Sequence, residues 1–213
     1  MREIKNLIFD LGNVIVDLDL ETSEELLRQL TGISWLNANA ADLEIFLDFE
    51  CGRIEEALFL NYLIDRSQNK VQAIDLIKAW NAMLVDIPLQ RLLMLKHLKK
   101  EYQVYLLSNT NETHIRWVDQ YLKTNYKISS LSDVVHTAFY SHELLCRKPD
   151  QEIYHQVLDR AGIKAEESVF FDDNHENIAA AHDLGIISIW VDPKDEITTV
   201  VPSILAELHA KTF

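Results

Sequence analysis

The chain has 213 residues, with 34 acidic and 20 basic side chains and a formal net charge of −14. A surface of this sign repels phosphate backbones and anionic lipids, so we expect no nucleic-acid and no membrane partner. Hydrophobic residues make up 48% of the chain and charged residues 25%, which is typical of a globular protein with its own core. The length fits one medium domain or one domain that carries an insertion.

Neither a membrane span nor a signal peptide is predicted. No apolar run approaches the ~20 residues that cross a bilayer, and Glu3, Lys5 and Asp10 interrupt the pattern of a secretory leader. Cytoplasm is therefore the expected location. Cys51 and Cys146 fit neither a disulfide framework nor a zinc site, and we interpret them as two reduced thiols.

The first strong signal is a short apolar run, residues 6–9, that leads directly into Asp10. Such a run, closed by Gly12 and Asn13, is typical of a strand buried in a parallel sheet. Ligand sites of open α/β sheets lie beyond the carboxyl ends of the strands, which is where Asp10 would emerge.

Residues 17–88 form a block in which we find helical spacing and no convincing strand. A helix with Thr22 or Ser23 as its N-cap is expected first, because an apolar stripe of leucines follows. The spacing of apolar residues then predicts helices over 38–49, 54–64 and 71–84.

After Pro88 the pattern changes to an alternation of helices and strands. Strands are expected over 103–107, 134–138, 168–171 and 186–191, and helices over 89–100, 112–122, 150–161 and 176–184. Repeated units of this kind predict an α/β fold with a Rossmann-like parallel sheet. Residues 1–16 and 89–213 would form the discontinuous core, and residues 17–88 a small helical domain inserted after the first strand. The last dozen residues suggest no function.

Polar side chains follow the predicted strands or precede the predicted helices at four places. They are Asp10, the pair Ser108 and Asn109, Lys148 before Pro149, and the pair Asp172 and Asp173. The carboxyl ends of parallel strands share one edge of a sheet, so these side chains are expected to meet there.

Four sequence phrases carry a family resemblance: FDLGNVIVDLD, LLSNTN, CRKPD and FFDDNHENI. In this order and spacing they resemble the four motifs of the haloacid dehalogenase superfamily, whose members are mostly phosphatases. Residues 17–88 match the cap which that family inserts after its first motif. Within the family, the chain is similar to bacterial phosphatases of α-glucose 1-phosphate and to the N-terminal phosphatase domain of soluble epoxide hydrolase.

The resemblance implies a role for each matched residue, and phosphoryl transfer gives each role a reason. Asp10 would attack phosphorus and form an aspartyl phosphate that water hydrolyses. Mg²⁺ prefers oxygen ligands, so Asp10, Asp173 and the carbonyl of Gly12 would hold it. Asp172 would act through a water molecule or by orienting one of the ligands. Lys148 would balance the charge of Asp10 and of the transferring group.

The phosphate itself would be bound by the Ser108 hydroxyl and the Asn109 amide, near a helix start, and by the turn residues Leu11 and Gly12. Each of these residues also has a plain structural interpretation. Ser108 suits a helix N-cap, the two adjacent aspartates suit helix capping, and a lysine is most often a solvated surface charge. Because two adjacent carboxylates repel each other, a metal explains the Asp172–Asp173 pair better than capping does.

One position departs from the family pattern. Most phosphatases of the family carry a second aspartate, a general acid, two residues after the nucleophile, and Gly12 stands there in this chain. General acid help is worth ~10²–10⁴-fold, so we expect a preference for leaving groups that need little protonation, such as anomeric or acyl phosphates. Asp17, Asp19 or a cap residue could supply the proton instead, although we interpret residues 17–19 as a hinge.

The segment Glu50–Ile54 resembles the glycine-containing turn that such caps point into the active site. Arg53 is thereby a candidate for contact with the far end of the substrate, with a surface position as the alternative. His114, His142 and His175 lie near the motifs, but no pair has metal-ligand spacing, and they are left without a role.

The sequence therefore predicts a Mg²⁺-dependent phosphatase, a monomer or homodimer, that acts on a small phosphate monoester such as a sugar phosphate. Two alternatives stay open. A 2-haloacid dehalogenase works without metal and does not need the paired carboxylates Asp172 and Asp173. A catalytically weak binding or regulatory protein would have little reason to keep Asp10, Ser108 and Lys148.

Overall fold

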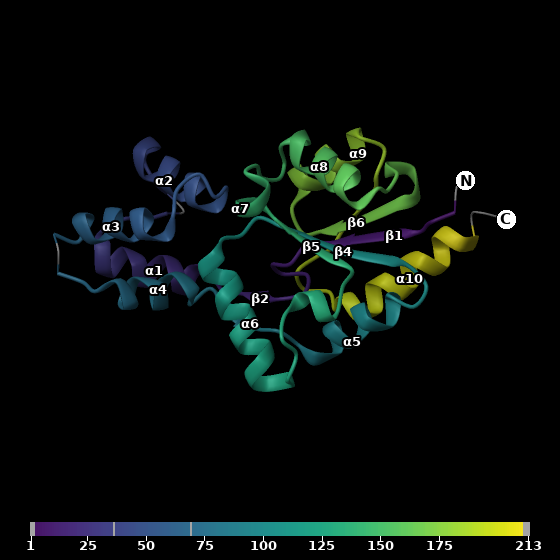
Figure 1. The fold of residues 1–213 in the computed structure, drawn as a ribbon, viewed down its shortest axis with the longest axis horizontal. Coiled ribbons are helices and arrows are strands. Elements are labelled where there is room, and N and C mark those ends of the chain that lie inside the picture. The colour runs from purple at the N-terminus through teal and green to yellow at the C-terminus, as the bar shows by residue number, and fades with distance from the viewer. Residues whose placement is uncertain (1–2, 36, 69, 211–213) are drawn as a thin grey trace.

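A computed structural model describes residues 3–35, 37–68 and 70–210 of the chain. It has a parallel sheet with helices on both faces, and four further helices, α1 to α4, form a lobe to one side (Figure 1). The predicted α/β class is confirmed. None of the described helices is long and apolar enough to cross a bilayer.

The main sheet has five strands in the order β5-β4-β1-β6-β7, all parallel to their neighbours. The bounds are Asn6–Phe9 for β1, Gln103–Ser108 for β4, Thr137–Tyr140 for β5, Ser168–Asp172 for β6 and Ile187–Trp190 for β7. In the central strand β1, Phe9 pairs with Leu106 on one side and with Phe171 on the other. The strands β1, β4 and β6 therefore end within two residues of one another, and the residues at their ends share one edge.

Alternate residues of β1 contact opposite layers of helices. Leu7 and Phe9 belong to the core on the side of α5 (Leu89–Leu98), α6 (Glu112–Tyr126) and α10 (Ile197–Ala210). Ile8 belongs to a second core on the side of α8 (Gln151–Ala161) and α9 (His175–Asp183), to which the short helix α7 (Ser141–Leu144) also contributes. Because both faces are covered, an unbroken apolar run is what this strand requires.

The helical lobe consists of α1 (Leu20–Thr31), α2 (Ala40–Glu50), α3 (Glu56–Arg66) and α4 (Ala73–Asn81). Aromatic rings fill its interior: Phe46 and Phe59 pack on Trp80 with centroid distances of 5.6 and 5.4 Å. Burial of such rings is the main stabilising contribution available to a lobe of this size.

Two predictions for the inserted block are wrong. It contains a strand, β3 (Leu84–Asp86), which pairs antiparallel with β2 (Asp17–Leu18) and joins the lobe to the core. The N-cap of α1 is Asp19 rather than Thr22 or Ser23, because the Asp19 carboxylate accepts from the Thr22 amide at 3.0 Å. Strands this short leave no periodicity that a sequence could show.

Near the C-terminal half, the expected strand over 134–138 begins later. A 3₁₀ turn, Leu131–Asp133, precedes it, and Val134 and Val135 pack into the core outside any strand. The helix α10 was not predicted, since it starts with a β-branched run and contains Pro202. Burial of Ile197 and Val201 outweighs their weak helix propensity.

Candidate active site

Lys148 contacts two aspartates at the edge of the sheet: Asp10, which follows β1, and Asp172, which ends β6. Its ammonium nitrogen lies 2.6 Å from Asp10 Oδ1 and 2.7 Å from Asp172 Oδ2, and it donates to the Leu107 carbonyl at 3.0 Å. The lysine is only 1% exposed. A buried ammonium needs such partners, because burial without them would cost several kcal/mol. The lysine is therefore part of the interior of the site, and the solvated surface interpretation is wrong.

The carboxylates of Asp10, Asp172 and Asp173 lie close together. Each offers an oxygen within 4.8 Å of the others. Burial raises the pKa of Asp10 to about 7, against the attraction of Lys148, and repulsion from Asp172 and Asp173 adds to the rise. Burial also raises the pKa of Asp173, whose one side-chain donor among the described residues is the Asn13 amide, at 2.8 Å. The site thus holds more negative charge than its one lysine balances.

Asp172 has a full set of donors from the protein. Besides Lys148, the Asn177 amide donates to its two oxygens at 3.0 and 3.1 Å, and the Asn174 backbone amide donates at 2.8 Å. The helix α9 is capped by Asn174, so neither aspartate serves as its N-cap. These donors fix the Asp172 carboxylate, which can then orient Lys148. The Asp173 carboxylate is held less firmly, by the Asn13 amide.

The backbone of Lys148 is held by the side chain of Asn109. The Asn109 amide donates to the Lys148 carbonyl at 2.9 Å, and its Oδ1 accepts from the Lys148 amide at 2.8 Å. Attraction to Asp10 and Asp172 outweighs the effect of burial, which lowers the pKa of Lys148, so that the net shift is upward. Lys148 therefore stays charged and fixed at the edge of the sheet.

Ser108 and Asn109 follow the same edge. The Ser108 hydroxyl contacts the Asn109 carbonyl at 3.4 Å, a weak hydrogen bond, so it is available to another acceptor. The helix α6 that starts beyond them is capped by Asn111, not by Ser108. The N-cap interpretation of Ser108 is therefore wrong.

Leu18 occupies the space beside Gly12. A Cβ atom on Gly12 would lie 2.6 Å from Leu18 Cδ1, closer than side-chain atoms approach. The space that a side chain at position 12 would enter is therefore occupied by Leu18 of β2, which would have to move to admit one. Asp17, another candidate proton donor, is ion-paired with Arg91 at 2.7 Å, and Asp19 caps α1.

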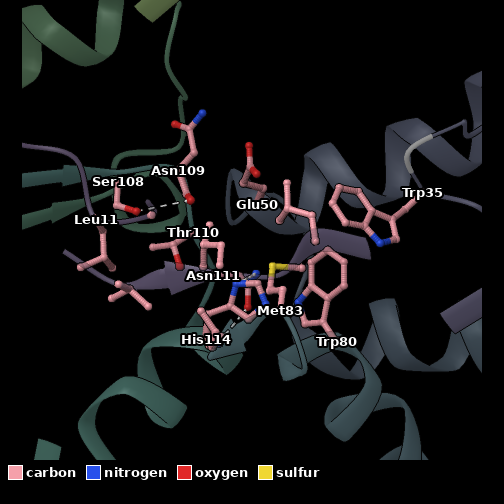
Figure 2. Close-up of a pocket in the computed structure, with 15 residues that line it drawn as sticks. Leu11, Trp35, Glu50, Trp80, Met83, Ser108, Asn109, Thr110, Asn111 and His114 are labelled. Carbon is pink, nitrogen blue, oxygen red and sulfur yellow. Dashed lines mark hydrogen bonds between the residues drawn. The ribbon is translucent and has the colours of Figure 1, made fainter. Parts of the chain in front are cut away.

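A cavity of about 210 Å³ opens between the core and the helical lobe, next to these residues (Figure 2). The core side contributes Leu11, Gly12 and Ser108. The lobe side contributes apolar and aromatic groups, with Glu50 as the one charged side chain among the described residues that line it. The complete set is Leu11, Gly12, Val16, Leu18, Leu20, Trp35, Glu50, Trp80, Met83, Leu84, Ser108, Asn109, Thr110, Asn111 and His114.

Arg53 is not brought to this cavity. Its guanidinium pairs with Asp48 at 2.6 Å on the surface of the lobe. Glu50, from the same turn, is the residue that reaches the cavity, and its carboxylate pairs with Arg147 of the core at 2.6 Å. A Cβ on Gly52 would lie 2.0 Å from the His142 carbonyl, so the turn packs directly against the core.

His114 connects the two sides of the cavity. Its ring stacks on Trp80 with centroids 5.1 Å apart, and the Asn111 amide lies 3.2 Å from its Nδ1. The Asn111 Oδ1 accepts from the His114 backbone amide, so the NH₂ group faces the ring and donates to Nδ1. Burial lowers the pKa of His114 to about 4, with His142 adding to the fall and the Trp80 carbonyl opposing it.

Because the pKa of His114 is lowered, we expect the protein to lose stability in acid. A lowered histidine pKa means that the unfolded chain binds the proton more tightly below pH 6.5, so the free energy of unfolding falls as the pH drops from 6.5 to 4. The loss is roughly 3 kcal/mol at about 1.4 kcal/mol per pH unit. Urea titrations of wild type and His114→Gln across this range check it. Equal pH slopes for the two proteins would contradict the assignment.

The acidic group fits a divalent cation. Its donors are all oxygens, which Mg²⁺ prefers. Burial, with a smaller contribution from repulsion among the carboxylates, raises the pKa of Asp10 and of Asp173, and a bound cation would favour their charged forms. The Gly12 carbonyl is the further ligand expected from the sequence.

Several residues around the site were not found from the sequence. Asn13 and Asn177 orient the aspartates, and the side chain of Asn109 holds the lysine. Asparagines near strand ends are common turn and cap residues, so their type alone does not distinguish these roles. Trp35 and Trp80 carry no local signal, since aromatic residues at helical spacing usually form core.

Comparisons with known proteins agree with this geometry. The model of a haloacid dehalogenase-like hydrolase family matches residues 4–185. The chain is 27% identical over 207 residues to a D-ribitol-5-phosphate phosphatase of Bacteroides thetaiotaomicron, covering 94% of this chain and all of the relative. A solved HAD family enzyme of the same organism, in complex with magnesium and inorganic phosphate, is 33% identical, with a TM-score of 0.81 over 92% of this chain and 98% of its own.

A more distant structure shows only the shared fold. A 2-haloacid dehalogenase from Pseudomonas syringae pv. Tomato is 21% identical, with a TM-score of 0.61 over 96% of this chain and 99% of its own. The match of the family model over most of the chain decides the assignment. The chain belongs to the haloacid dehalogenase-like hydrolase family and is an enzyme of that family.

Proposed function

We propose that this hydrolase is a Mg²⁺-dependent phosphatase that forms an aspartyl phosphate on Asp10. The contact of the Lys148 ammonium with both Asp10 and Asp172 carries the proposal, together with the oxygen of Asp173 in the same group. Asp10 and Asp173, with the Gly12 carbonyl, would hold the ion, and Asp172 would orient Lys148. When bound, Mg²⁺ supplies positive charge that allows the ionised Asp10 to approach a phosphate.

The side chains then have distinct tasks in the two steps. An Asp10 oxygen forms a bond to phosphorus while the bond to the leaving oxygen breaks, and the leaving oxygen takes a proton from a water molecule held beside it. Lys148 and the Ser108 hydroxyl stabilise charge on the phosphoryl oxygens, and the Asn109 amide adds a donor. Water then attacks phosphorus, which releases phosphate and restores the Asp10 carboxylate.

We further propose that the substrate is a sugar phosphate or sugar-alcohol phosphate. The cavity of about 210 Å³ is smaller than the ~300 Å³ at which drug-sized sites begin, so the leaving group is small. The related phosphatase acts on ribitol 5-phosphate, which is a molecule of this class. Residues 17–88 would be the cap that covers it, and residues 1–16 and 89–213 the catalytic core. Closure of the cap excludes bulk water from the reacting groups.

A screen of phosphate esters tests the proposed function. Phosphate release is measured with Mg²⁺ and with EDTA, on wild type and on Asp10→Asn. We expect release from p-nitrophenyl phosphate and from at least one sugar or sugar-alcohol phosphate, in Mg²⁺ and with the wild type only. Equal release with EDTA, or from the variant, would overturn the proposal. Chloride release from 2-chloropropionate in EDTA would instead establish the dehalogenase alternative.

Because Leu18 fills the place of a general acid, the rate is expected to depend steeply on the leaving group. An aryl phosphate whose phenol has a lower pKa should react faster, since no side chain at position 12 donates a proton. Single-turnover rates across substituted phenyl phosphates measure this slope. The variant Gly12→Asp with Leu18→Ala makes room for an acid and should flatten it. A flat wild-type profile with chemistry limiting the rate would contradict the expectation.

A further inference from the structure

Trp190, the last residue of β7, lies beside the segment that carries two of the clustered aspartates. Its backbone is in register with Asp172 across the sheet, and the Val191 amide donates to the Asp172 carbonyl at 3.0 Å. The indole N–H reaches one residue further and donates to the backbone carbonyl of Asp173 at 2.8 Å. The edge strand β7 therefore holds the end of β6 through its backbone, and the residue beyond that end through this side chain.

The face of the indole is fixed as well. It stacks on the ring of His175, with centroids 4.7 Å apart and an angle of 16° between the planes. His175 is the first residue of α9, so the two contacts of Trp190 fall at the beginning and at the end of the turn that joins β6 to this helix. The stacked ring and the hydrogen bond both oppose rotation of the indole, and they thereby restrict movement of the Asp173 peptide.

Packing in the core does not account for a tryptophan at this position. Trp190 is 40% exposed and belongs to neither of the two cores that the described residues form, whereas Ile187 and Ile189 of the same strand pack against one of them. Burial therefore stabilises this ring less than it stabilises a core residue. What an indole adds here is the N–H that Asp173 accepts and a broad face for His175.

Asp173 is the member of the acidic group for which added restraint matters most. Its carboxylate has one side-chain donor among the described residues, the Asn13 amide, whereas several donors fix Asp172. Mg²⁺ requires nearly octahedral geometry, and ligands that are fixed beforehand lose less freedom when the ion binds. The Trp190 contact supplies such restraint from the backbone side of Asp173.

We propose that Trp190 is a positioning residue for the Mg²⁺ site, because its N–H fixes the Asp173 peptide and so preorganises the carboxylate for the ion. This inference rests on the proposed role of Asp173 as a Mg²⁺ ligand. Trp190 acts through Asp173 and does not itself touch the ion or the substrate. Its loss should therefore weaken Mg²⁺ binding and leave the transfer step intact once the ion is bound.

Trp190→Phe tests the proposal, since it keeps a ring on His175 and removes the N–H. Calorimetric titration of Mg²⁺ into protein treated with EDTA and dialysed measures binding without any substrate. We expect the variant to bind Mg²⁺ about 3–10-fold more weakly than wild type, as for the loss of one neutral hydrogen bond. With p-nitrophenyl phosphate, the Mg²⁺ concentration for half-maximal activity should rise by the same factor, while kcat at saturating Mg²⁺ stays within about twofold.

Trp117→Phe is the matched control, because Trp117 also stacks on one ring, that of Tyr121 at 5.0 Å, and lies in α6 instead of β7. It should bind Mg²⁺ as wild type does, and a loss equal to that of Trp190→Phe would overturn the proposal. A fall in kcat that saturating Mg²⁺ does not restore would show disturbed packing and would also overturn it. If Trp190→Phe does not fold, Trp190→Leu repeats the test and should weaken Mg²⁺ binding at least as much.

The wild-type measurements separate this inference from the proposed function. If wild type binds Mg²⁺ and hydrolyses p-nitrophenyl phosphate while Trp190→Phe binds the ion equally well, the positioning proposal is wrong and the phosphatase proposal stands. If Trp190→Phe weakens Mg²⁺ binding as expected but wild type releases phosphate from no ester, the positioning proposal stands and the phosphatase proposal is wrong. A wild type that binds no Mg²⁺ would overturn both.

Discussion

Asp10→Asn is expected to lower kcat by on the order of 10⁵-fold, with the fold intact. The side chain keeps its size, but the amide cannot form the bond to phosphorus, and loss of a nucleophile costs about this much in other enzymes with covalent intermediates. Stopped assays of phosphate release measure the loss. Its physical basis is that Asp10, at the end of β1, is the carboxylate that contacts the Lys148 ammonium and lies with Asp173 in one acidic group.

The same variant distinguishes a covalent route from direct attack by water. Acid quenching of wild type during turnover with a ³²P-labelled ester should trap label on the protein, and Asp10→Asn should trap none. The matched control is Asp86→Asn, which alters a carboxylate in β3, between the helical lobe and the core, and should retain labelling. Labelling of the Asp10→Asn protein would disprove the assignment of the nucleophile.

Lys148→Met is expected to lower the free energy of unfolding by about 3–5 kcal/mol and kcat by about 10²–10³-fold. The stability loss arises because the buried carboxylates of Asp10 and Asp172 lose the ammonium that contacts both. The kinetic loss arises because charge that develops on the phosphoryl group loses a fixed cation. Urea unfolding at pH 7 and kcat for p-nitrophenyl phosphate measure the two effects.

The double variant Asp10→Asn with Lys148→Met provides the control for stability. Removing one carboxylate together with the lysine leaves less unpaired charge, so the double variant should be more stable than the sum of the two single changes predicts, by about 0.5–3 kcal/mol. Strict additivity would mean that the contact between Lys148 and Asp10 contributes nothing to the fold. Lys5→Met, which breaks the pair of the exposed Lys5 with the partly buried Glu167, should change stability by less than about 1 kcal/mol.

The sequence by itself was sufficient for the class of the fold and for the order of its main strands and helices. The reason is local: the apolar run 6–9 and the strand β6 are continuous because both faces of a parallel sheet are covered. The same rule, that the strands of such a sheet end at one edge, led from separate motifs to the expected meeting of Asp10, Lys148 and Asp172. Helix ends and very short strands were harder to predict from the sequence, as the N-cap Asp19 and the pair β2–β3 show.

Only the tertiary structure decided what surrounds those residues. Asn13 and Asn109 hold partners that lie 160 and 39 positions away in the chain, and no local pattern encodes such contacts. The cavity wall likewise joins Trp80 of the lobe to His114 of the core, and Leu18 fills the space beside Gly12. Periodicity reports which face of an element is buried, whereas the partner across that face depends on how the elements pack.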